Sequence, residues 1–479
     1  MKQLLFVFIV LSSLIYAQDS ARIYLQYGNA KYNQGDYKGA IKDYSNSIRI
    51  NPNEAEAYIC RGNAKYHLKN YNDAIKDFDK ALEINPDDAD AYNDRGLVKY
   101  YRGLVKYSLE DYNDAIRDFN KALEINPDHA SAYYNRGIAS NYFANYNAAI
   151  EDFSKVIEIN PNETEAYIYR GNAEYHLNDY NDAIEDYNKA LEITPNNANA
   201  YNNRGLVKYC LGDFNGAIED YNKAVKIDPD DAYAYYNRGL ARDSLADYKG
   251  SIEDFTRAIE VNPNYIDAYY NRGNAEYRLN DYNKAIEDYS KALESNPDYA
   301  DAYFNRGMAK NNLTNYNAAI EDFNNDLEIN PDDADAYFYR GLAKYHLENY
   351  NDAIVDFNKD LDIIPDDADA YFYRGLAKYH LKDYNDAIEN FNKDLEINPN
   401  DADAYFYRGV AKDSLGDYNE AIEDYNKDLE IEPNDGWAYI NRGKIRKKLG
   451  DKAGACTDWN KASALGLSAA DELLQRYCK

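Results

Sequence analysis

Proline recurs in this chain at an almost constant interval. The twelve prolines are separated by 34 residues in ten of eleven intervals and by 41 residues in the other. They are Pro52, Pro86, Pro127, Pro161, Pro195, Pro229, Pro263, Pro297, Pro331, Pro365, Pro399 and Pro433. A length of 479 residues alone would suggest about three ordinary domains. Because no proline lies elsewhere, the spacing instead predicts a repeat array.

One unit, residues 402–435, shows what is repeated. Its first half has small or apolar residues at Ala404, Tyr405, Gly409, Ala411 and Leu415, and its second half at Tyr418, Ala421, Ile422, Tyr425, Leu429 and Ile431. Spacings of three and four in both halves predict two amphipathic helices. Asp417 and Glu420 resemble a capping box at the start of the second helix, and Pro433 follows its end. Such a hairpin can bury its apolar face only by stacking on neighbours.

The 34-residue period, with the pattern Tyr405, Gly409, Ala421, Tyr425 and Pro433, resembles the tetratricopeptide repeat (TPR). The resemblance implies an all-α, right-handed superhelical solenoid whose concave surface is lined mainly by the first helix of each unit. Thirteen units span residues 21–469, and positions are counted from the first residue of each unit. The units start at Ala21, Ala55, Ala89, Ala130, Thr164, Ala198, Ala232, Ile266, Ala300, Ala334, Ala368, Ala402 and Gly436.

The two ends of the chain differ from the repeats. Lys2, the apolar run from Leu4 to Ile15 and Ala17 predict a secretory signal peptide over residues 1–17, cleaved after Ala17. The alternative is an uncleaved anchor, although the run is short for a membrane span. We therefore expect an exported protein, periplasmic or secreted, with no transmembrane span in the mature chain.

The carboxyl-terminal end is predicted to carry a cap. Residues 468–478 have apolar side chains at helical spacing and predict a helix that covers the last unit. Cys456 and Cys478 fall in these two adjacent elements, and in an oxidising compartment they are candidates for a disulfide. The alternative is a pair of buried free cysteines. Cys60 and Cys210 lie four units apart and are expected to be unpaired.

The 41-residue interval contains a tandem copy. Residues 95–101 read RGLVKYY and residues 102–108 read RGLVKYS. Seven residues are close to two helical turns, so the first helix of unit three can lengthen by about 10 Å and keep its faces aligned. We expect one long protruding helix, and the alternative is a looped-out insertion in an ordinary unit.

Two charged positions recur inside the predicted helices. The seventh residue is arginine in almost every unit, with Arg102 assigned to this role in unit three, and the twenty-third is aspartate except for Asn390. A partly buried arginine needs a carboxylate or carbonyl partner. Unit one, which has no preceding unit, has Tyr27 instead of arginine. This end effect favours pairing across the junction between units, such as Asp43 with Arg61.

By the resemblance, the concave surface exposes the second, fifth, ninth, twelfth and thirteenth positions. The second is mostly acidic, the fifth and twelfth are mostly apolar or aromatic, and the thirteenth carries four of the five histidines. The candidate binding residues are Tyr66, His67, Tyr134, Tyr175, His176, Tyr236, Tyr270, Tyr277, Phe304, Phe338, Tyr345, His346, Phe372, Tyr379, His380 and Phe406. The alternative is that these aromatic residues reflect composition and repeat copying, since units ten and eleven are identical at 27 of 34 positions.

These features favour an exported, non-enzymatic scaffold that binds extended basic or apolar segments of partner proteins. A net charge of −30 argues against nucleic acid as a partner. No catalytic, phosphate-binding or metal motif occurs, so no enzyme activity, cofactor or metal is expected. Two alternatives remain: a carbohydrate or cell-wall ligand stacked on tyrosine rings, and a structural spacer with no ligand in the groove.

Overall fold

The computed structural model describes residues 2–478, and it describes side chains from Gln18 onward. In this part of the chain every regular element is a helix, from α1 to α27, and no strand is present. The predicted signal peptide, residues 1–17, lies outside the residues whose side chains are described. Among the described residues, no helix combines the length and the hydropathy that a membrane crossing requires.

Each repeat forms a hairpin of two helices. The first helices are α1 (Lys2–Asn33), α3 (Ala55–His67), α5 (Ala89–Lys106), α7 (Ala130–Tyr142), α9 (Thr164–His176), α11 (Ala198–Cys210), α13 (Ala232–Ser244), α15 (Ile266–Arg278), α17 (Ala300–Asn312), α19 (Ala334–His346), α21 (Ala368–His380), α23 (Ala402–Leu415) and α25 (Gly436–Lys448). The second helices are α2 (Tyr37–Ile50), α4 (Tyr71–Ile84), α6 (Leu109–Ile125), α8 (Tyr146–Ile159), α10 (Tyr180–Ile193), α12 (Phe214–Ile227), α14 (Tyr248–Val261), α16 (Tyr282–Ser295), α18 (Tyr316–Ile329), α20 (Tyr350–Ile363), α22 (Tyr384–Ile397), α24 (Tyr418–Ile431) and α26 (Lys452–Ala464). A final helix, α27 (Ser468–Tyr477), follows unit thirteen.

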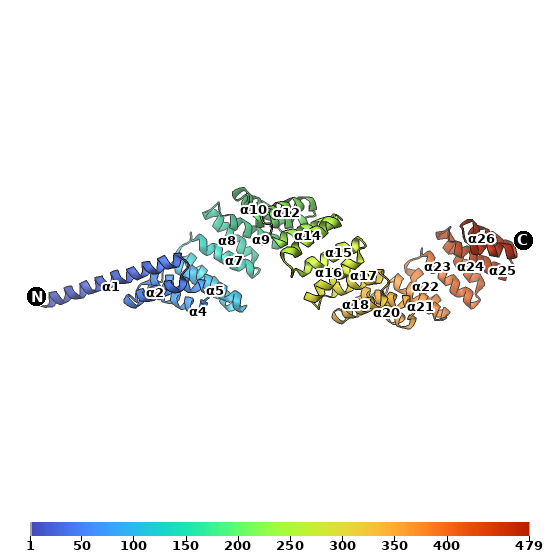
Figure 1. Ribbon diagram of the computed structural model, residues 1–479, viewed down its shortest axis with the longest axis horizontal. Coiled ribbons are helices and arrows are strands. Elements are labelled where there is room, and N and C mark those ends of the chain that lie inside the picture. Colours follow the sequence, from blue (N-terminus) through green and yellow to red (C-terminus); the bar gives the residue numbers. More distant parts are fainter. Residues whose placement is uncertain (1, 479) are drawn as a thin grey trace. The chain divides into compact units, whose positions relative to one another are not determined.

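The helices are grouped in two compact halves, residues 1–241 and 242–479. Within each half, a second helix packs on the first helix of its own hairpin and on the first helix of the next one, as α16 does between α15 and α17 (Figure 1). Each half is therefore a stack of helical hairpins, which is the architecture of an α-solenoid.

A glycine and an aromatic ring hold each hairpin together. Tyr425 is fully buried, and a Cβ atom placed on Gly409 would lie only 3.0 Å from its ring. Ala421, which packs in the same cluster, and Ala404 are also completely buried. Close approach of the two helices thus requires small residues at these positions, because packed interiors have no spare volume.

The arginine of the seventh position does pair with an aspartate of the twenty-third position, but with that of its own unit and not with that of the preceding unit. Arg340 donates from Nε and Nη2 to the two carboxylate oxygens of Asp356, over 3.0 and 2.7 Å. Both residues belong to unit ten. The predicted pairing across the junction, Asp43 with Arg61, is wrong: Arg61 binds Asp77 of its own unit, and Asp43 binds Lys31. The carboxylate is buried inside its own hairpin, directly opposite the arginine, and accepts a bidentate bond there.

The same guanidinium also reaches the preceding unit. Arg340 donates from Nη1 to the side chain of Asn324, at position 25 of unit nine, over 2.7 Å. The corresponding acceptors of the other arginines are Ser45, Asp79, Asn120, Ser154, Asn188, Asn222, Thr256, Ser290, Asn358, Asn392 and Asn426. Because this third bond needs a preceding unit, it provides a physical reason why unit one has Tyr27 in place of arginine.

In unit three, Arg95 makes the bonds that the seventh-position arginine makes in the other units. This arginine binds Asp118 in its own unit and Asp79 in the unit before. The assignment of Arg102 to that role is therefore wrong. Arg102 instead binds Asp111 and Asn72, because the seven extra residues move it almost two turns along the helix.

The seven extra residues lengthen both helices of unit three. Helix α5 has 18 residues where α3 has 13, and α6 has 17 where α4 has 14. The expected single long helix is thus replaced by a longer hairpin, in which Ser108 caps α6 by accepting from the backbone N–H of Asp111. Val105, Tyr107 and Leu109 at its tip are exposed.

The last unit is closed by α27. Trp459 is fully buried and packs with Ala470 and Tyr477 of that helix. Cys456 and Cys478 form a disulfide with their Cα atoms 5.8 Å apart. Among the described residues, the free cysteines are Cys60 and Cys210.

Candidate functional site: the face of the first helices

The candidate aromatic residues of the fifth position are half-buried and pack against the core of their hairpins. The ring centroid of Phe338 lies 5.9 Å from that of Phe357 in its own hairpin and 5.9 Å from that of Tyr373 in the next unit. Tyr134, Tyr270, Phe304, Phe372 and Phe406 make the same contact with the core ring of their own hairpin. Tyr236 in α13 is likewise half-buried. These side chains pack each hairpin with part of the ring and leave the rest accessible.

The candidate tyrosines of the twelfth position lie beside the first tyrosine of the second helix. Tyr345 contacts Tyr350 with ring centroids 5.5 Å apart, and Tyr379 contacts Tyr384 at the same distance. Tyr66, Tyr175 and Tyr277 have the corresponding neighbour in their own units. All five are half-buried.

The four candidate histidines contact the preceding unit. His380 stacks on Tyr350 with a ring-centroid distance of 4.8 Å and an interplanar angle of 3°. His67, His176 and His346 stack in the same way on Tyr37, Tyr146 and Tyr316. Each imidazole therefore joins two units. Among the described residues, no cluster of three or more histidine, cysteine or acidic side chains could hold a metal ion.

Carboxylates form an exposed row on the first helices of units nine to twelve. We call Asp301, Asp335, Asp369 and Asp403, at the second position, the acidic row; all four are exposed. Asp333, Asp367 and Asp401 lie next to this row and cap the helices by accepting backbone N–H bonds. Partial burial, with repulsion from Asp333 and Asp367, raises the pKa of Asp335. The pKa values of Asp369 and Asp403 are raised in the same way. Negative charge is thus crowded along this face.

A second set of carboxylates lies beneath the acidic row and was missed in the sequence. We call Asp326, Asp360, Asp394 and Asp428, at position 27 of units nine to twelve, the buried aspartates. Each is 1% exposed, and each has at least one oxygen without a hydrogen-bond partner in the described residues. Burial, followed by repulsion from Asp333 and Asp301, raises the pKa of Asp326 to about 7. The available signal was a change of residue: position 27 is alanine in most earlier units, such as Ala258 and Ala292.

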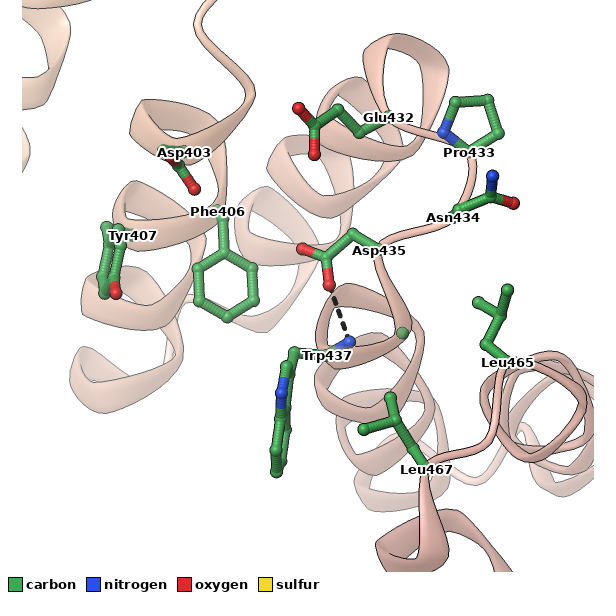
Figure 2. Close-up of a pocket in the computed structure, with 11 residues that line it drawn as sticks. Asp403, Phe406, Tyr407, Glu432, Pro433, Asn434, Asp435, Trp437, Leu465 and Leu467 are labelled. Carbon is green, nitrogen blue, oxygen red and sulfur yellow. Dashed lines mark hydrogen bonds between the residues drawn. The ribbon is translucent and has the colours of Figure 1, made fainter. Parts of the chain in front are cut away.

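A cavity of about 730 Å³ lies at the junction of units twelve and thirteen. Figure 2 shows Asp403, Phe406 and Tyr407 of α23 on one side, and Asp435 and Trp437 at the start of α25 on the other. Glu432, Pro433, Asn434, Gly436, Leu465 and Leu467 complete the lining. Asp435 is held in place because it accepts from the backbone N–H groups of Trp437 and Ala438.

A second cavity, of about 460 Å³, occurs in the amino-terminal half between units three and four. It is lined by Asn93, Ala130, Ser131, Tyr134, Asn135, Val156, Asn160 and Glu163. Positions 2, 5, 6, 31 and 34 of a unit therefore surround both cavities. Val156, at position 27, lines this cavity, whereas Asp428, at position 27 of unit twelve, is not among the residues that line the larger one.

Sequence models of the repeat match along much of the chain. Models described as "TPR repeat" match residues 28–69, 103–140, 171–212, 208–242 and 273–312. Models described as "Tetratricopeptide repeat" match residues 55–88, 130–163, 232–265, 255–287, 300–333, 368–401 and 402–435. The chain belongs to the tetratricopeptide repeat family. The predicted all-α repeat fold is confirmed.

Several solved TPR structures resemble parts of this TPR chain. The MamA protein is 27% identical over 36% of this chain and 92% of its own, with a TM-score of 0.33. YrrB, described as a TPR protein with an unusual peptide-binding site, is 27% identical over 40% of this chain and 95% of its own, with a TM-score of 0.34. A TPR protein from Parabacteroides merdae is 20% identical over 51% and 94%, with a TM-score of 0.41. A comparison with curated proteins found no match.

Proposed function

We propose that this TPR chain is a non-catalytic scaffold that binds basic segments of partner proteins on the first helices of units nine to twelve. The acidic row carries the proposal. Four exposed carboxylates, with capping aspartates beside them, concentrate negative charge on this face. Partial burial, followed by repulsion from the capping aspartates, raises the pKa values of Asp335, Asp369 and Asp403. A bound lysine or arginine relieves this repulsion, and perturbed carboxylates of this kind cluster at functional sites.

Aromatic side chains provide the apolar part of the same surface. Phe338 and Phe372 are half-buried between the hairpin core and the next unit. They follow Asp335 and Asp369 by three residues, so each lies on the same helix face as a carboxylate of the acidic row. Rings held in this way offer contact area at a low entropic cost, because they are already fixed before a ligand binds. A segment that mixes basic and apolar residues fits both features.

Export is a second part of the proposal. The first 17 residues have the composition of a signal peptide. A disulfide between Cys456 and Cys478 is typical of an oxidising compartment. Sequencing of the amino terminus after expression tests export: a mature chain that begins at Gln18 supports it, and an intact chain retained in the cytoplasm contradicts it.

Binding is tested with labelled twelve-residue peptides of lysine and glycine or of glutamate and glycine, followed by fluorescence anisotropy. The lysine peptide should bind and should weaken as salt screens the charges, whereas the glutamate peptide should not bind. Replacing Asp335, Asp369 and Asp403 with asparagine should raise the Kd of the lysine peptide by roughly tenfold or more.

The control variant has the same net charge. It replaces Glu294, Glu396 and Glu430, exposed on the second helices, with glutamine. The Kd of this variant should stay within about twofold of the wild type, because the three glutamates lie on the second helices, outside the acidic row. Their exposed ion pairs with lysine contribute little to stability, so the fold should be unaffected. An equal loss in both variants, or an absence of binding, would overturn the proposed site. Salt-insensitive binding of an oligosaccharide instead of the peptide would favour a carbohydrate ligand.

A further inference from the structure

Three aspartates recur together in each of units nine to twelve. They occupy positions 2, 27 and 34, so each unit has one residue of the acidic row, one buried aspartate and one aspartate that caps the next first helix. We call each set an aspartate triplet, and in unit ten it consists of Asp335, Asp360 and Asp367. Earlier units lack the combination, since unit eight has Ala292 and Tyr299 at the last two positions. The triplets therefore coincide with the proposed binding surface.

The buried member of each triplet lies in a packed interior. Asp360 is 1% exposed and its Oδ2 atom has no hydrogen-bond partner among the described residues, and neither oxygen of Asp394 has one. Ala258 and Ala292, at the same position in units seven and eight, are completely buried. The carboxyl group thus takes a place that a methyl group fills elsewhere. An ionised carboxylate would be uncompensated there, so the free protein holds the group as the neutral acid.

The other two aspartates of a triplet act on the buried one from both helices against which it packs. Helix α20, which carries Asp360, packs on α19 and α21. Asp335 lies on α19 and Asp367 caps α21. Burial, followed by repulsion from Asp367 and Asp335, raises the pKa of Asp360 to about 7. The corresponding neighbours are Asp333 and Asp301 for Asp326, and Asp401 and Asp369 for Asp394. The acidic row is therefore coupled electrostatically to the buried aspartates.

The triplet of unit twelve contains a hydrogen bond that requires a proton. Asp428 is hydrogen-bonded to Asp435, and two carboxyl groups can share such a bond only when one of them is protonated. Burial, followed by repulsion from Asp435 and by this bond, raises the pKa of Asp428 to about 8. Glu432 and Asp403 add smaller repulsions. The proton therefore belongs to Asp428, whose O–H group donates to Asp435.

We propose that units nine to twelve release protons when they bind a basic segment: a lysine or arginine at the acidic row offsets the repulsion that keeps the buried aspartate of the same unit protonated. The carboxyl O–H bond then breaks, the carboxylate stays in place and the proton passes to solvent. This inference rests on the proposed function, because it describes how binding at that surface is regulated. The complex holds fewer protons than the free protein, so affinity rises with pH through the neutral range.

Calorimetry measures the released protons directly. The full chain is titrated with the lysine–glycine peptide, its ends blocked so that they do not titrate, in PIPES and in Tris, two buffers with different enthalpies of ionisation. The heat of binding should differ between the buffers, and the Kd should fall roughly tenfold from pH 6 to pH 8.

Replacing the buried aspartates with alanine should abolish both effects. The changes are Asp326→Ala, Asp360→Ala, Asp394→Ala and Asp428→Ala in one protein, and circular dichroism verifies its fold. Its Kd at pH 6 should stay within about twofold of the wild type, because both proteins are neutral at position 27 there. A second variant with asparagine at the four positions keeps the shape of the neutral acid and should behave in the same way.

The matched control is Glu276→Gln in unit eight. Glu276 is 6% exposed, and burial, followed by repulsion from Asp288, raises its pKa to about 7, but it belongs to no triplet. Its loss should leave the number of released protons unchanged. If the peptide binds with the same heat in both buffers, if the alanine protein still releases protons, or if Glu276→Gln abolishes the release, the proton inference is wrong and the acidic row stands. If the peptide does not bind at any pH, the proposed function itself is wrong.

Discussion

Arg374 donates its Nε–H to the side-chain oxygen of Asn390 over 2.6 Å, in the one unit whose twenty-third residue is not aspartate. The second, charge-assisted bond from Nη2 that Arg340 makes to Asp356 has no counterpart here. Burial lowers the pKa of Arg374, and Lys378 turns to the more exposed Asp383 and Asp386. Unit eleven thus has two cations without a buried carboxylate between them.

Asn390→Asp should stabilise unit eleven. The new carboxylate accepts a bidentate bond from Arg374, and a hydrogen bond to a charged group contributes about 1.5–3 kcal/mol. Urea denaturation and hydrogen exchange of α21 and α22 measure the gain. The control, Asn400→Asp, makes the same chemical change in an exposed loop where unit ten already has Asp366, and it should have almost no effect. A destabilised Asn390→Asp protein would contradict the recurring role of the pair.

The buried aspartates predict a stability that falls as pH rises. The pKa values of Asp326, Asp360 and Asp394 are about 7, against about 3.9 in an unfolded chain. Between these values the folded protein binds more protons, so the free energy of unfolding decreases with increasing pH. Replacing all three with alanine should therefore stabilise the protein at pH 8.5, by roughly 1–3 kcal/mol per site, and by less at pH 4. Urea denaturation at both pH values measures this, and a gain that is independent of pH would refute it.

Thr314→Gly should stabilise unit nine. Thr314 has a φ of 58° in the turn between α17 and α18, which is a costly conformation for a β-branched residue. Unit twelve has Gly416 at this position, with a φ of 92°. We expect a gain of about 1 kcal/mol in thermal or urea denaturation. Replacing the glycine at this position in unit twelve, Gly416→Ala, should cause a comparable loss. Equal stability of all three proteins would show that the turn is not strained.

Loss of the disulfide should release the terminal cap. The bond between Cys456 and Cys478 joins residues 22 positions apart, and closing a loop of this length stabilises by about 3 kcal/mol in the chain-entropy model. Cys478→Ser should therefore speed hydrogen exchange in α26 and α27 and leave the units of the other half unchanged. Cys210→Ser, at a free cysteine, is the control. Protection that is the same in all variants would show that packing of Trp459 alone holds the cap.

Deletion of residues 102–108 should convert unit three into an ordinary unit. Tyr101 would then be followed by Leu109, as His67 is followed by Leu68 in unit two, and α6 would begin at Tyr112. Stability should fall by no more than about 1–2 kcal/mol, because Val105 and Tyr107 are exposed, and the contacts of Leu104 and Arg102 belong to the extension that is removed. Hydrogen exchange measures this, and a loss of protection throughout α5 and α6 would show that the extension belongs to the core of the unit.

The hairpins could be predicted because their pattern follows from local spacing. Gly409, Ala421 and Tyr425 recur at fixed positions, and only helices place them on one face. The partner of Arg340 was assigned to the wrong unit because the same guanidinium bonds both Asp356 and the preceding unit's Asn324. A positional pattern identifies which residues interact but does not supply the distances that rank two candidate partners.

The face of the first helices was predicted only in part. The resemblance placed Phe338 and His380 on the concave surface, and in the structure Phe338 is half-buried and His380 is exposed. The contacts of both with neighbouring units depend on how two hairpins pack. Asp428 was missed because an aspartate in a charged helix is normally exposed. Its burial depends on the packing of neighbouring helices, and the local sequence around Asp428 has no feature from which this packing could be predicted.

The disulfide that joins α27 to unit thirteen makes the two ends of the array differ in stability. Unit thirteen is locked to its cap by the bond between Cys456 and Cys478, whereas the described residues contain no disulfide at the amino-terminal end. In a stack whose units depend on their neighbours, an unsealed end opens first. Thermal fraying and proteolytic trimming should therefore advance from unit one toward unit thirteen, so that the carboxyl-terminal cavity is among the last features of the protein to be lost.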